Sequence, residues 1–188
     1  GAHTDVQLFA WLFSTSDDFG PAINANIDLG VSSISILEKI ATAAEGQVAR
    51  VHLKIDSGLH RNGASQALWP DLVARARALE KTGRIHVVGV WTHIGEASDR
   101  DDDESQRIFD QACVVARDAG LKFSDMHLAA SAASSARPEF RYTFCRVGGF
   151  TYGVAPGDGL GPNELSIEPV MRVESYVNDV SERDGAGT

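Results

Sequence analysis

The stretch LFAWLF at Leu8–Phe13 is an unbroken apolar run, and the polar residues 14–18 follow it directly. A strand with one face in water alternates polar and apolar side chains, whereas an unbroken apolar run is typical of a strand buried on both faces. Such strands occur in parallel sheets that helices cover on both sides. The run therefore predicts a parallel α/β sheet.

Segments with strand and helix character alternate along the chain after this run. The helical segments carry apolar residues at helical spacing, and Ser33 is the expected N-cap of the second helix. The expected strands are 8–13, 28–33, 50–56, 85–92, 125–130 and 143–147, and the expected helices are 19–26, 34–45, 66–81, 104–118 and a short segment from Ser131. This alternation predicts a parallel sheet with crossover helices.

Two architectures have this order of elements, an open doubly wound sheet and a (β/α)8 barrel. No G-x-G-x-x-G pattern follows the first strand, which disfavours the dinucleotide-binding version of the open sheet. A barrel needs eight strands, so the six expected units would leave two missing.

The composition excludes several classes of function. A formal net charge of −9 over 188 residues argues against nucleic-acid binding, which needs basic patches. No apolar run approaches the roughly 20 residues of a membrane helix, and there is no signal-peptide pattern. Cys113 and Cys145 are expected to be free thiols, so we expect a cytoplasmic protein. Because the chain begins Gly1-Ala2-His3 without an initiator methionine, we expect a processed product, a tagged product or a piece of something longer.

Functional side chains recur at the carboxyl end of the expected strands. In a parallel barrel these ends form a single face, and that face holds the active site. The residues are Trp11 late in the first strand, Lys54 and Asp56 at the end of the third, Arg61 in the loop behind it, His93 after the fourth, Ser131 after the fifth, and Arg146 with Gly148 at the sixth. Their positions predict one site built from several strands.

Several of these residues also have a purely structural interpretation. Lys54 and Asp56 are two apart on a strand and would form an ion pair inside the barrel. His93 would be a core histidine with satisfied hydrogen bonds. Ser131 would be a helix cap, and Trp11 would be ordinary barrel packing.

The segment Arg146–Gly153, with the sequence RVGGFTYG, combines a permanent cation with closely spaced glycines. Glycine lets backbone N–H groups approach a ligand, and arginine donates without deprotonating. Together they suit an anionic or heteroaromatic ligand, and we interpret the segment as one wall of a pyridoxal-phosphate site. The phosphate would meet the Ser131 hydroxyl, the helix N–H groups that follow it, and the N–H groups of Gly148 and Gly149.

Four segments together resemble the alanine racemase family. Residues 51–63 (VHLKIDSGLHRNG) are similar to its H-L-K-x-D-T-G-M-x-R-x-G signature, and 89–93 (GVWTH) to its T-H segment. Residues 127–133 (HLAASAA) are similar to H-L-A-N-S-A-A, and Arg146–Gly153 to R-x-G-x-x-x-Y-G. The resemblance implies a fold-type III (β/α)8 TIM barrel that binds pyridoxal 5'-phosphate, incomplete here with about six of eight units.

The resemblance also assigns roles to individual side chains. Arg146 would donate to the pyridine nitrogen and, as a permanent cation, keep it unprotonated. Arg61 would lie near the cofactor's phenolic oxygen and the substrate carboxylate, and His93 would stack on the ring or pair with Arg146. Lys54 resembles a lysine that is carbamylated in many members. The implied catalytic residues are Arg61, His93 and Arg146, and the implied cofactor-binding residues are Trp11, His93, Ser131, Arg146, Gly148 and Gly149.

The same resemblance divides the chain into three parts. Residues 1–155 would be the partial barrel, 156–166 a linker rich in proline and glycine, and 167–188 the start of a C-terminal β-domain, with a strand-like alternation at 171–177. The chain departs from the family at Ala130, where an asparagine is usual, and at 94–98.

The implied reaction is the interconversion of L-alanine and D-alanine through a pyridoxal-phosphate Schiff base with two-base proton transfer. The family's enzyme is a homodimeric isomerase that supplies D-alanine for peptidoglycan. Its Schiff-base lysine lies in a K-x-N-A-Y-G-H-G stretch that the 188 residues do not contain, and its opposing tyrosine lies in the β-domain. Because racemisation needs a base on each face of the α-carbon, we expect the chain alone to be inactive.

Three alternatives remain. One is a pyridoxal-phosphate decarboxylase or a racemase of other amino acids, although such decarboxylases place an acidic residue where this chain has Arg146. A second is a non-catalytic pyridoxal-phosphate-binding barrel protein. A third is a metal-dependent hydrolase using Asp56, His60 and His93, but no metal-ligand spacing supports it, and we expect no metal.

Overall fold

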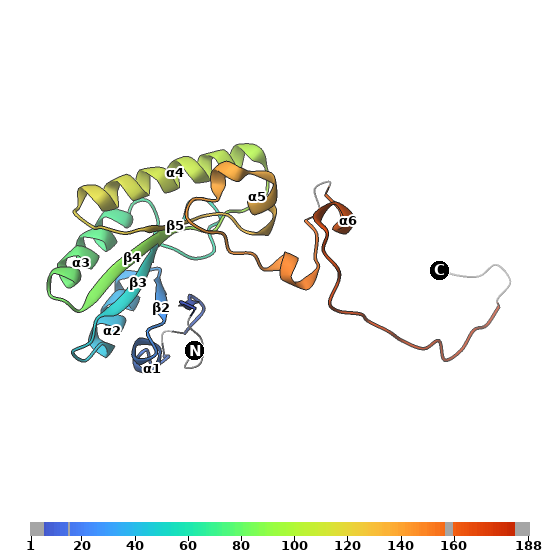
Figure 1. Cartoon of the computed structure of the whole chain (residues 1–188), viewed down its shortest axis with the longest axis horizontal. Coiled ribbons are helices and arrows are strands. Elements are labelled where there is room, and N and C mark those ends of the chain that lie inside the picture. Colours follow the sequence, from blue (N-terminus) through green and yellow to red (C-terminus); the bar gives the residue numbers. More distant parts are fainter. Residues whose placement is uncertain (1–5, 15, 157–159, 183–188) are drawn as a thin grey trace. The chain divides into compact units, whose positions relative to one another are not determined.

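The computed structural model describes residues 6–14, 16–156 and 160–182 (Figure 1). The chain divides into two compact units, 1–147 and 148–188. Residues 157–159 of the expected linker and 183–188 of the expected β-domain lie outside the described residues.

The first unit is built on one five-stranded sheet in which all neighbouring strands are parallel. The strands are β1 (Phe9–Ala10), β2 (Asp28–Val31), β3 (Ala49–Lys54), β4 (Ile85–Trp91) and β5 (Asp125–His127), in the order of the sequence. Each new strand is added beside the last, as in a barrel, whereas the order of a doubly wound sheet reverses at a switch point. The expected class, an incomplete (β/α)8 barrel, is confirmed.

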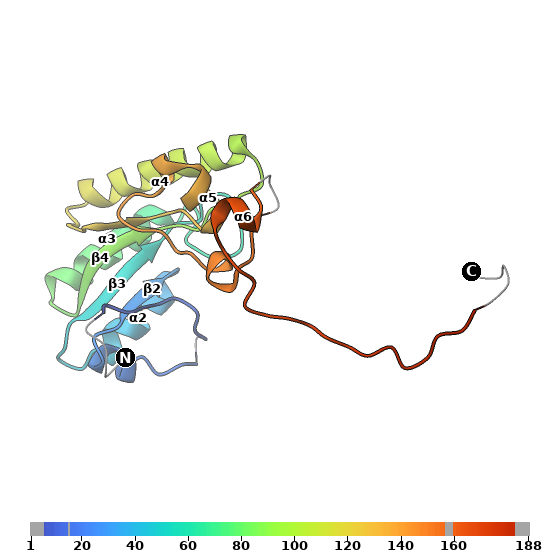
Figure 2. The same ribbon diagram turned by 45° about the vertical axis from the view of Figure 1, so that its right-hand side comes forward.

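Helices connect the strands and cover the outer face of the sheet (Figures 1 and 2). They are α1 (Gly20–Asn24), α2 (Ile34–Ala43), α3 (Trp69–Lys81), α4 (Asp99–Asp118) and α5 (Ser131–Ala136), with a 3-10 turn, η1, at Pro138–Phe140. Parallel strands need crossovers of this kind, because a tight hairpin cannot join them. Within the described ranges, no helix is both long enough and apolar enough to cross a bilayer.

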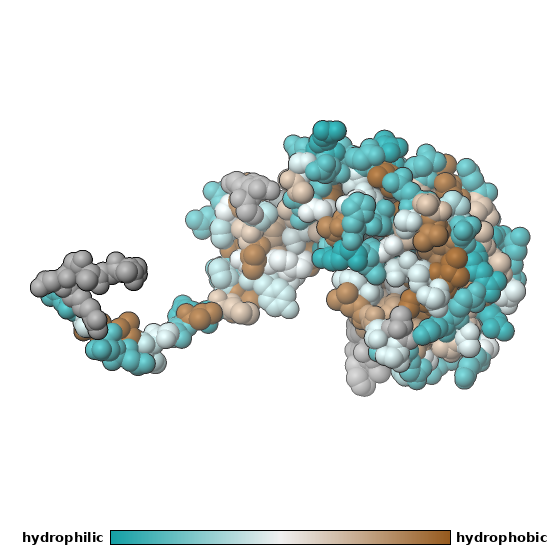
Figure 3. Space-filling model, turned by 180° about the vertical axis from the view of Figure 1, so that it is seen from behind, coloured by the Kyte–Doolittle hydropathy of each residue, from teal (hydrophilic) through white to brown (hydrophobic). Residues whose placement is uncertain are grey.

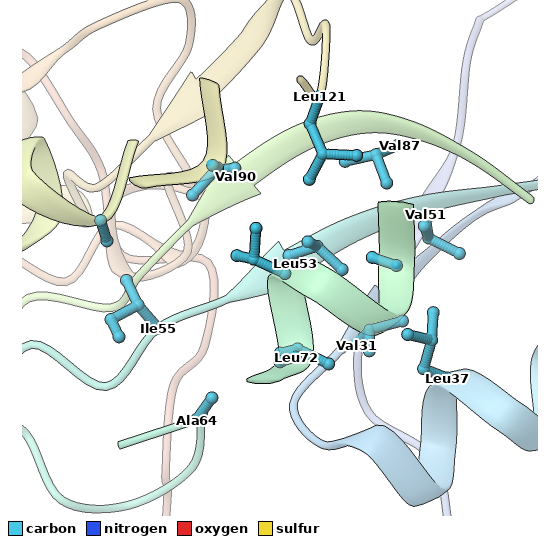
Figure 4. Packing of buried hydrophobic residues seen from close by; sticks show 14 of the residues in the cluster. Val31, Leu37, Val51, Leu53, Ile55, Ala64, Leu72, Val87, Val90 and Leu121 are labelled. Atoms are coloured by element: carbon cyan, nitrogen blue, oxygen red, sulfur yellow. The ribbon is translucent and has the colours of Figure 1, made fainter. Parts of the chain in front are cut away.

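The core lies between the sheet and these helices (Figure 4). Successive strand residues point to opposite faces, so Val51 and Leu53 of β3 point toward the helices while the residue between them points inward. In Figure 4 they lie near Val87 of β4, Leu37 of α2 and Leu72 of α3. Because these side chains are fully buried, each contributes about 1.5–3 kcal/mol relative to an exposed one.

Serine caps fix the start of two helices. Ser33 accepts a hydrogen bond from a first-turn N–H of α2, as predicted. Ser98 does the same for α4, which therefore begins at Asp99 and not at the predicted residue 104. The acidic run 99–103, which the sequence pattern left outside the helix, forms its first turns, where the helix dipole favours negative charge.

The strand predicted at 143–147 is wrong, because these residues lie beside β5 without forming a strand. The N–H of Thr143 donates to the Met126 carbonyl at 3.0 Å, and the N–H of Arg146 donates to the Ala129 carbonyl at 3.1 Å. The Thr143 hydroxyl also accepts from the N–H of Met126 and donates to its carbonyl, both at 2.8 Å. A side chain therefore takes the place of part of the ladder, and the described sheet has five strands, not six.

The second unit contains a 3-10 turn, η2 (Gly149–Tyr152), and a short helix, α6 (Pro162–Leu165). Residues 167–182 form no strand, although Figure 3 shows apolar and polar side chains following one another along this segment. Val173 and Tyr176 are each 92% exposed. The backbone N–H groups of Ile167 and Val170 donate to the carbonyls of Pro162 and Tyr152, at 3.0 and 3.3 Å. These bonds do not form a strand ladder, so the β-domain stays a prediction.

Replacing Ser98 with alanine removes the cap of α4. We expect the free energy of unfolding, measured by urea denaturation, to fall by about 1 kcal/mol because a first-turn N–H loses its acceptor. Ser98→Thr keeps the hydroxyl and is the matched control. An equal loss in both variants would show that the hydroxyl does not stabilise the start of this helix.

Candidate functional site

The inner face of the sheet, opposite the helices, carries the polar side chains of the candidate site. The register pairs His52 with Gly89 and Lys54 with Trp91, so these residues of β3 and β4 share that face. Glycine is required opposite the histidine, because a Cβ at Gly89 would lie 2.2 Å from Nδ1 of His52. The His52 side chain of β3 therefore requires glycine at position 89 of β4.

Aromatic rings fill the space enclosed by the curled sheet. The Phe9 ring of β1 lies 4.6 Å from the His52 ring and 5.3 Å from the His127 ring of β5, so the first and last strands approach each other across the inner face. His127 also stacks with Trp91 at 5.4 Å and with Phe144 at 4.2 Å. Packed rings at these separations attract one another, and they exclude water from the polar groups between them.

Arg146 lies at the centre of the site. Its Nη1 donates to Nδ1 of His127 at 2.7 Å. Its Nη2 donates to the carbonyls of Thr92 (2.6 Å) and Leu128 (3.1 Å), which directly follow β4 and β5. Nη2 also donates to Nδ1 of His93 at 3.1 Å. These four bonds use neither Nε nor the second hydrogen of Nη1, so within the described part of the chain these donors remain for a ligand.

Arg146 keeps its positive charge although its side chain is half-buried. Burial lowers the pKa of Arg146 to about 10, which leaves the guanidinium protonated at neutral pH. Its plane also lies over the Trp91 ring, 4.8 Å from the ring centre. An aromatic face attracts a cation, so this contact adds to the hydrogen bonds that hold Arg146.

His93 pairs with Arg146, which is one of the two positions that the family resemblance implied. Burial, followed by the charges of Arg146, Arg61 and Lys54, lowers the pKa of His93 to about 4. The ring is therefore neutral at pH 7, and its Nδ1 serves as an acceptor for the guanidinium.

Lys54 does not form the predicted ion pair with Asp56. Its Nζ donates to Oδ1 of Asn62 at 3.1 Å and lies 4.4 Å from the centre of the Trp91 ring. The Asp56 carboxylate turns into its own loop, where it accepts from two backbone N–H groups. The backbone of the loop after β3 binds the Asp56 carboxylate, and Lys54 is left without an ion-pair contact to it.

Two neighbouring cations change the chemistry of Lys54. Burial, followed by the charges of Arg61 and Arg146, lowers the pKa of Lys54 to about 8. Arg61 lies exposed in the loop after β3, where the sequence placed it. A lysine with a lowered pKa offers a neutral, nucleophilic amine, which carbamylation requires. The modification itself stays a prediction.

Trp11 lies just past the end of β1 and is 40% exposed. Its ring stacks on Phe9 at 5.1 Å and meets Trp91 at 6.0 Å. A cavity of about 200 Å³ opens beside it and is also lined by Lys54 and Asn62. A larger cavity, of about 520 Å³, is lined by none of these residues.

The first unit holds only part of the expected phosphate wall. Ser131 begins α5 as predicted. In the first turn of α5, the N–H of Ala133 donates to Oε1 of Glu96 at 2.8 Å, so a carboxylate already occupies one donor there. Gly148 and Gly149 begin the second unit, and their meeting with Ser131 stays a prediction.

Residues 2–156 match the family model described as "Alanine racemase, N-terminal domain", which is more than half of the chain. The chain belongs to the alanine racemase family. The alanine racemase of Frankia casuarinae is 39% identical over 189 residues, covering 97% of this chain and 49% of the relative. That of Mycobacterium ulcerans is 37% identical over 189 residues, covering 96% and 48%.

Solved alanine racemase structures share the fold. The enzyme of D-cycloserine-producing Streptomyces lavendulae has a TM-score of 0.85 at 32% identity, covering 89% of this chain and 46% of that one. The enzyme of Streptomyces coelicolor A3(2) has a TM-score of 0.82 at 30% identity, covering 88% and 45%. The chain therefore spans about half the length of the relatives it matches.

The sequence alone assigned no role to two histidines that are buried in the site of this alanine racemase family member. His52 and His127 each lie in a quoted motif, and each is at most 1% exposed. The strand period could have placed His52 on the same face as Lys54, two residues later. Its contact with His127 depends on the register of three strands, which the sequence does not show.

One group of described residues brings donor atoms close enough for a metal. Atoms of Asp28, His52 and Asp125 lie within 4.8 Å of one another. Asp28 already accepts hydrogen bonds from Arg50, and both ring nitrogens of His52 have partners, Asp28 and His127. Asp28 and His52 therefore have hydrogen-bond partners within the protein, and we interpret the group as a hydrogen-bonded cluster and not as a metal site.

The lowered pKa of Lys54 predicts early reaction with amine reagents. The extent of acetylation, measured by peptide mass spectrometry across pH, should reach half its plateau near pH 8 at Lys54, against about 10.4 for an ordinary lysine. Exposed Lys122 in the same digest controls for the reagent. A midpoint at Lys54 near the ordinary lysine value would contradict the electrostatics described here.

Proposed function

We propose that the full-length protein carrying this chain is a pyridoxal-phosphate-dependent alanine racemase that interconverts L-alanine and D-alanine. The observation that carries the proposal is the half-buried Arg146 cation, which neutral acceptors hold at the carboxyl ends of β4 and β5. The named relatives support it. Because the chain spans about half of each relative, the activity is proposed for the full-length protein.

Pyridoxal 5'-phosphate fits the residues of this rim. Toward the residues that the structure describes, Arg146 leaves two donors unused, and it keeps its charge, which suits an unprotonated pyridine nitrogen. Trp11 is 40% exposed and meets the Trp91 ring, over which Arg146 also lies. Ser131, Gly148 and Gly149 are the proposed phosphate partners. When bound, the cofactor supplies an electron-withdrawing ring that acidifies the α-carbon hydrogen of an amino acid.

The chain's own residues control how strongly that ring acts. With a pKa near 10, Arg146 would donate a hydrogen bond to the ring nitrogen and would keep its own proton. By leaving that nitrogen unprotonated, Arg146 would disfavour transamination. Neutral His93 holds the guanidinium in place, and Arg61 is the proposed partner of the substrate carboxylate.

Racemisation requires one base to remove a proton and another to return it on the opposite face. We infer that a lysine and a tyrosine elsewhere in the full-length protein act as these bases, with the tyrosine contributed across a homodimer. A cytoplasmic role in supplying D-alanine for peptidoglycan belongs to the same proposal.

Enzyme assays test the proposal directly. The full-length protein with pyridoxal phosphate should produce D-alanine from L-alanine, detected by coupled D-amino-acid oxidation, and the 188-residue chain should not. Turnover by the chain alone would contradict the two-base argument. Conversion of another amino acid but not alanine would support the racemase of other substrates, and cofactor binding without turnover would support the non-catalytic barrel protein.

Removing the cation should impair catalysis. Arg146→Gln in the full-length enzyme should lower kcat about 100-fold, because the donor that holds the ring nitrogen loses its charge. Arg141→Gln is the matched control, since the hydrogen bonds of exposed Arg141 to the described residues all go to main-chain carbonyls. The cofactor's absorbance should be recorded for both variants. Equal activity in both would refute the role of Arg146.

A further inference from the structure

A continuous line of hydrogen bonds crosses the inner face of the sheet and ends at Arg146. Nη1 of Arg146 lies 2.7 Å from Nδ1 of His127. Nε2 of His127 lies 3.0 Å from Nδ1 of His52, and Nε2 of His52 lies 3.2 Å from Oδ2 of Asp28. Asp28, His52 and His127 are all at most 2% exposed, so water does not substitute for any of these partners.

The donor direction of this line follows from its arginine end. A guanidinium has only donors, so Nδ1 of His127 must be the acceptor. We therefore assign the hydrogen of the neutral His127 ring to Nε2, which donates to Nδ1 of His52. His52 then carries its hydrogen on Nε2 and donates to Asp28. Every bond points from Arg146 toward Asp28.

The other end of the line fixes the same direction. Although burial alone would raise the pKa of Asp28, hydrogen bonds from His52 and Arg50 bring that pKa below its ordinary value. Asp28 is therefore an ionised carboxylate, which can only accept. Nε of Arg50 lies 2.5 Å from Oδ1, and Gln7 Nε2 lies 3.1 Å from the same oxygen. A donor at one end and an acceptor at the other leave one arrangement of hydrogens.

The burial of His127 supports the neutral state of its ring. Burial, followed by the charge of Arg146, holds the pKa of His127 far below its ordinary value. A hydrogen on Nδ1 of His127 would face the Nη1 hydrogens of Arg146 at 2.7 Å, which puts two donors against each other. The reversed tautomer therefore costs Arg146 one of its acceptors.

We propose that Asp28 is a positioning residue for Arg146, and that it acts through the tautomers of His52 and His127. By keeping Nδ1 of His127 an acceptor, Asp28 directs one Nη1 hydrogen of Arg146 away from the rim and leaves the remaining donors for a ligand. The role toward the cofactor rests on the proposed function, but the hydrogen-bond order belongs to the chain itself.

Asp28→Asn is a nearly isosteric test of the direction. Nε of Arg50 and Nε2 of Gln7 donate to Oδ1 at 2.5 and 3.1 Å, whereas Nη2 of Arg50 donates to Oδ2 at 3.2 Å. Because the shorter contacts are at Oδ1, the single carbonyl oxygen of the new amide should stay there, and the Arg50 contact at the Oδ2 position should be lost. The NH2 group then faces Nε2 of His52, which must become an acceptor. His52 and His127 should both move their hydrogen to Nδ1, and Arg146 should lose its contact with His127.

Nitrogen-15 NMR of labelled histidine reports these tautomers without any cofactor. In the 188-residue chain, His52 and His127 should both carry hydrogen on Nε2 alone, and in Asp28→Asn both should carry it on Nδ1. Asp125→Asn, which removes a nearby charge outside the line, is the control and should change neither ring. Hydrogen on Nδ1 of either ring in the original chain would overturn the proposal, whatever the variants do.

The full-length enzyme then tests the positioning. Asp28→Asn should lower kcat about 10-fold or more with little change in KM for alanine, and Asp125→Asn should not. Reversed tautomers with unchanged kcat would overturn the positioning role. An original enzyme without racemase activity, but with the expected tautomers, would refute the proposed function and leave the hydrogen-bond order standing.

Discussion

The partial burial of one guanidinium group is the constraint on which the rest of the site depends. A permanent charge is unfavourable away from water unless hydrogen bonds replace its hydration. Around Arg146 these bonds come from the carbonyls of Thr92 and Leu128 and from the imidazoles of His93 and His127, all of them neutral. A carboxylate would have satisfied the same donors, but it would have cancelled the charge that the rim presents.

The parallel sheet makes this arrangement possible. Thr92 and Leu128 each follow the last residue of a strand, and the two strands are neighbours, so their free carbonyls reach the same point. Alternation along β3 sends Val51 and Leu53 into the helical layer and His52 inward. One topology therefore supplies the apolar core on one face and the polar line on the other.

The sequence predicted the features that depend on nearby residues. The Ser33 cap and the alternation of elements are local, and both are found. The predicted strand at 143–147 fails because the Thr143 side chain takes over ladder bonds. The Lys54–Asp56 ion pair fails because the following loop supplies N–H donors to the carboxylate. Both failures come from competing partners that a periodicity argument does not contain.

The charge distribution connects these observations. The chain carries a net charge of −9, yet Arg146, Arg61 and Lys54 act together at one rim, where their charges add to burial in lowering the pKa of His93. An anion approaching the protein responds to this local field and not to the net charge. The loop that removes Asp56 from Lys54 therefore has a consequence beyond packing, because it keeps positive charge where a phosphate and a substrate carboxylate are proposed to bind. An ion pair there would have stabilised the lysine and weakened that field.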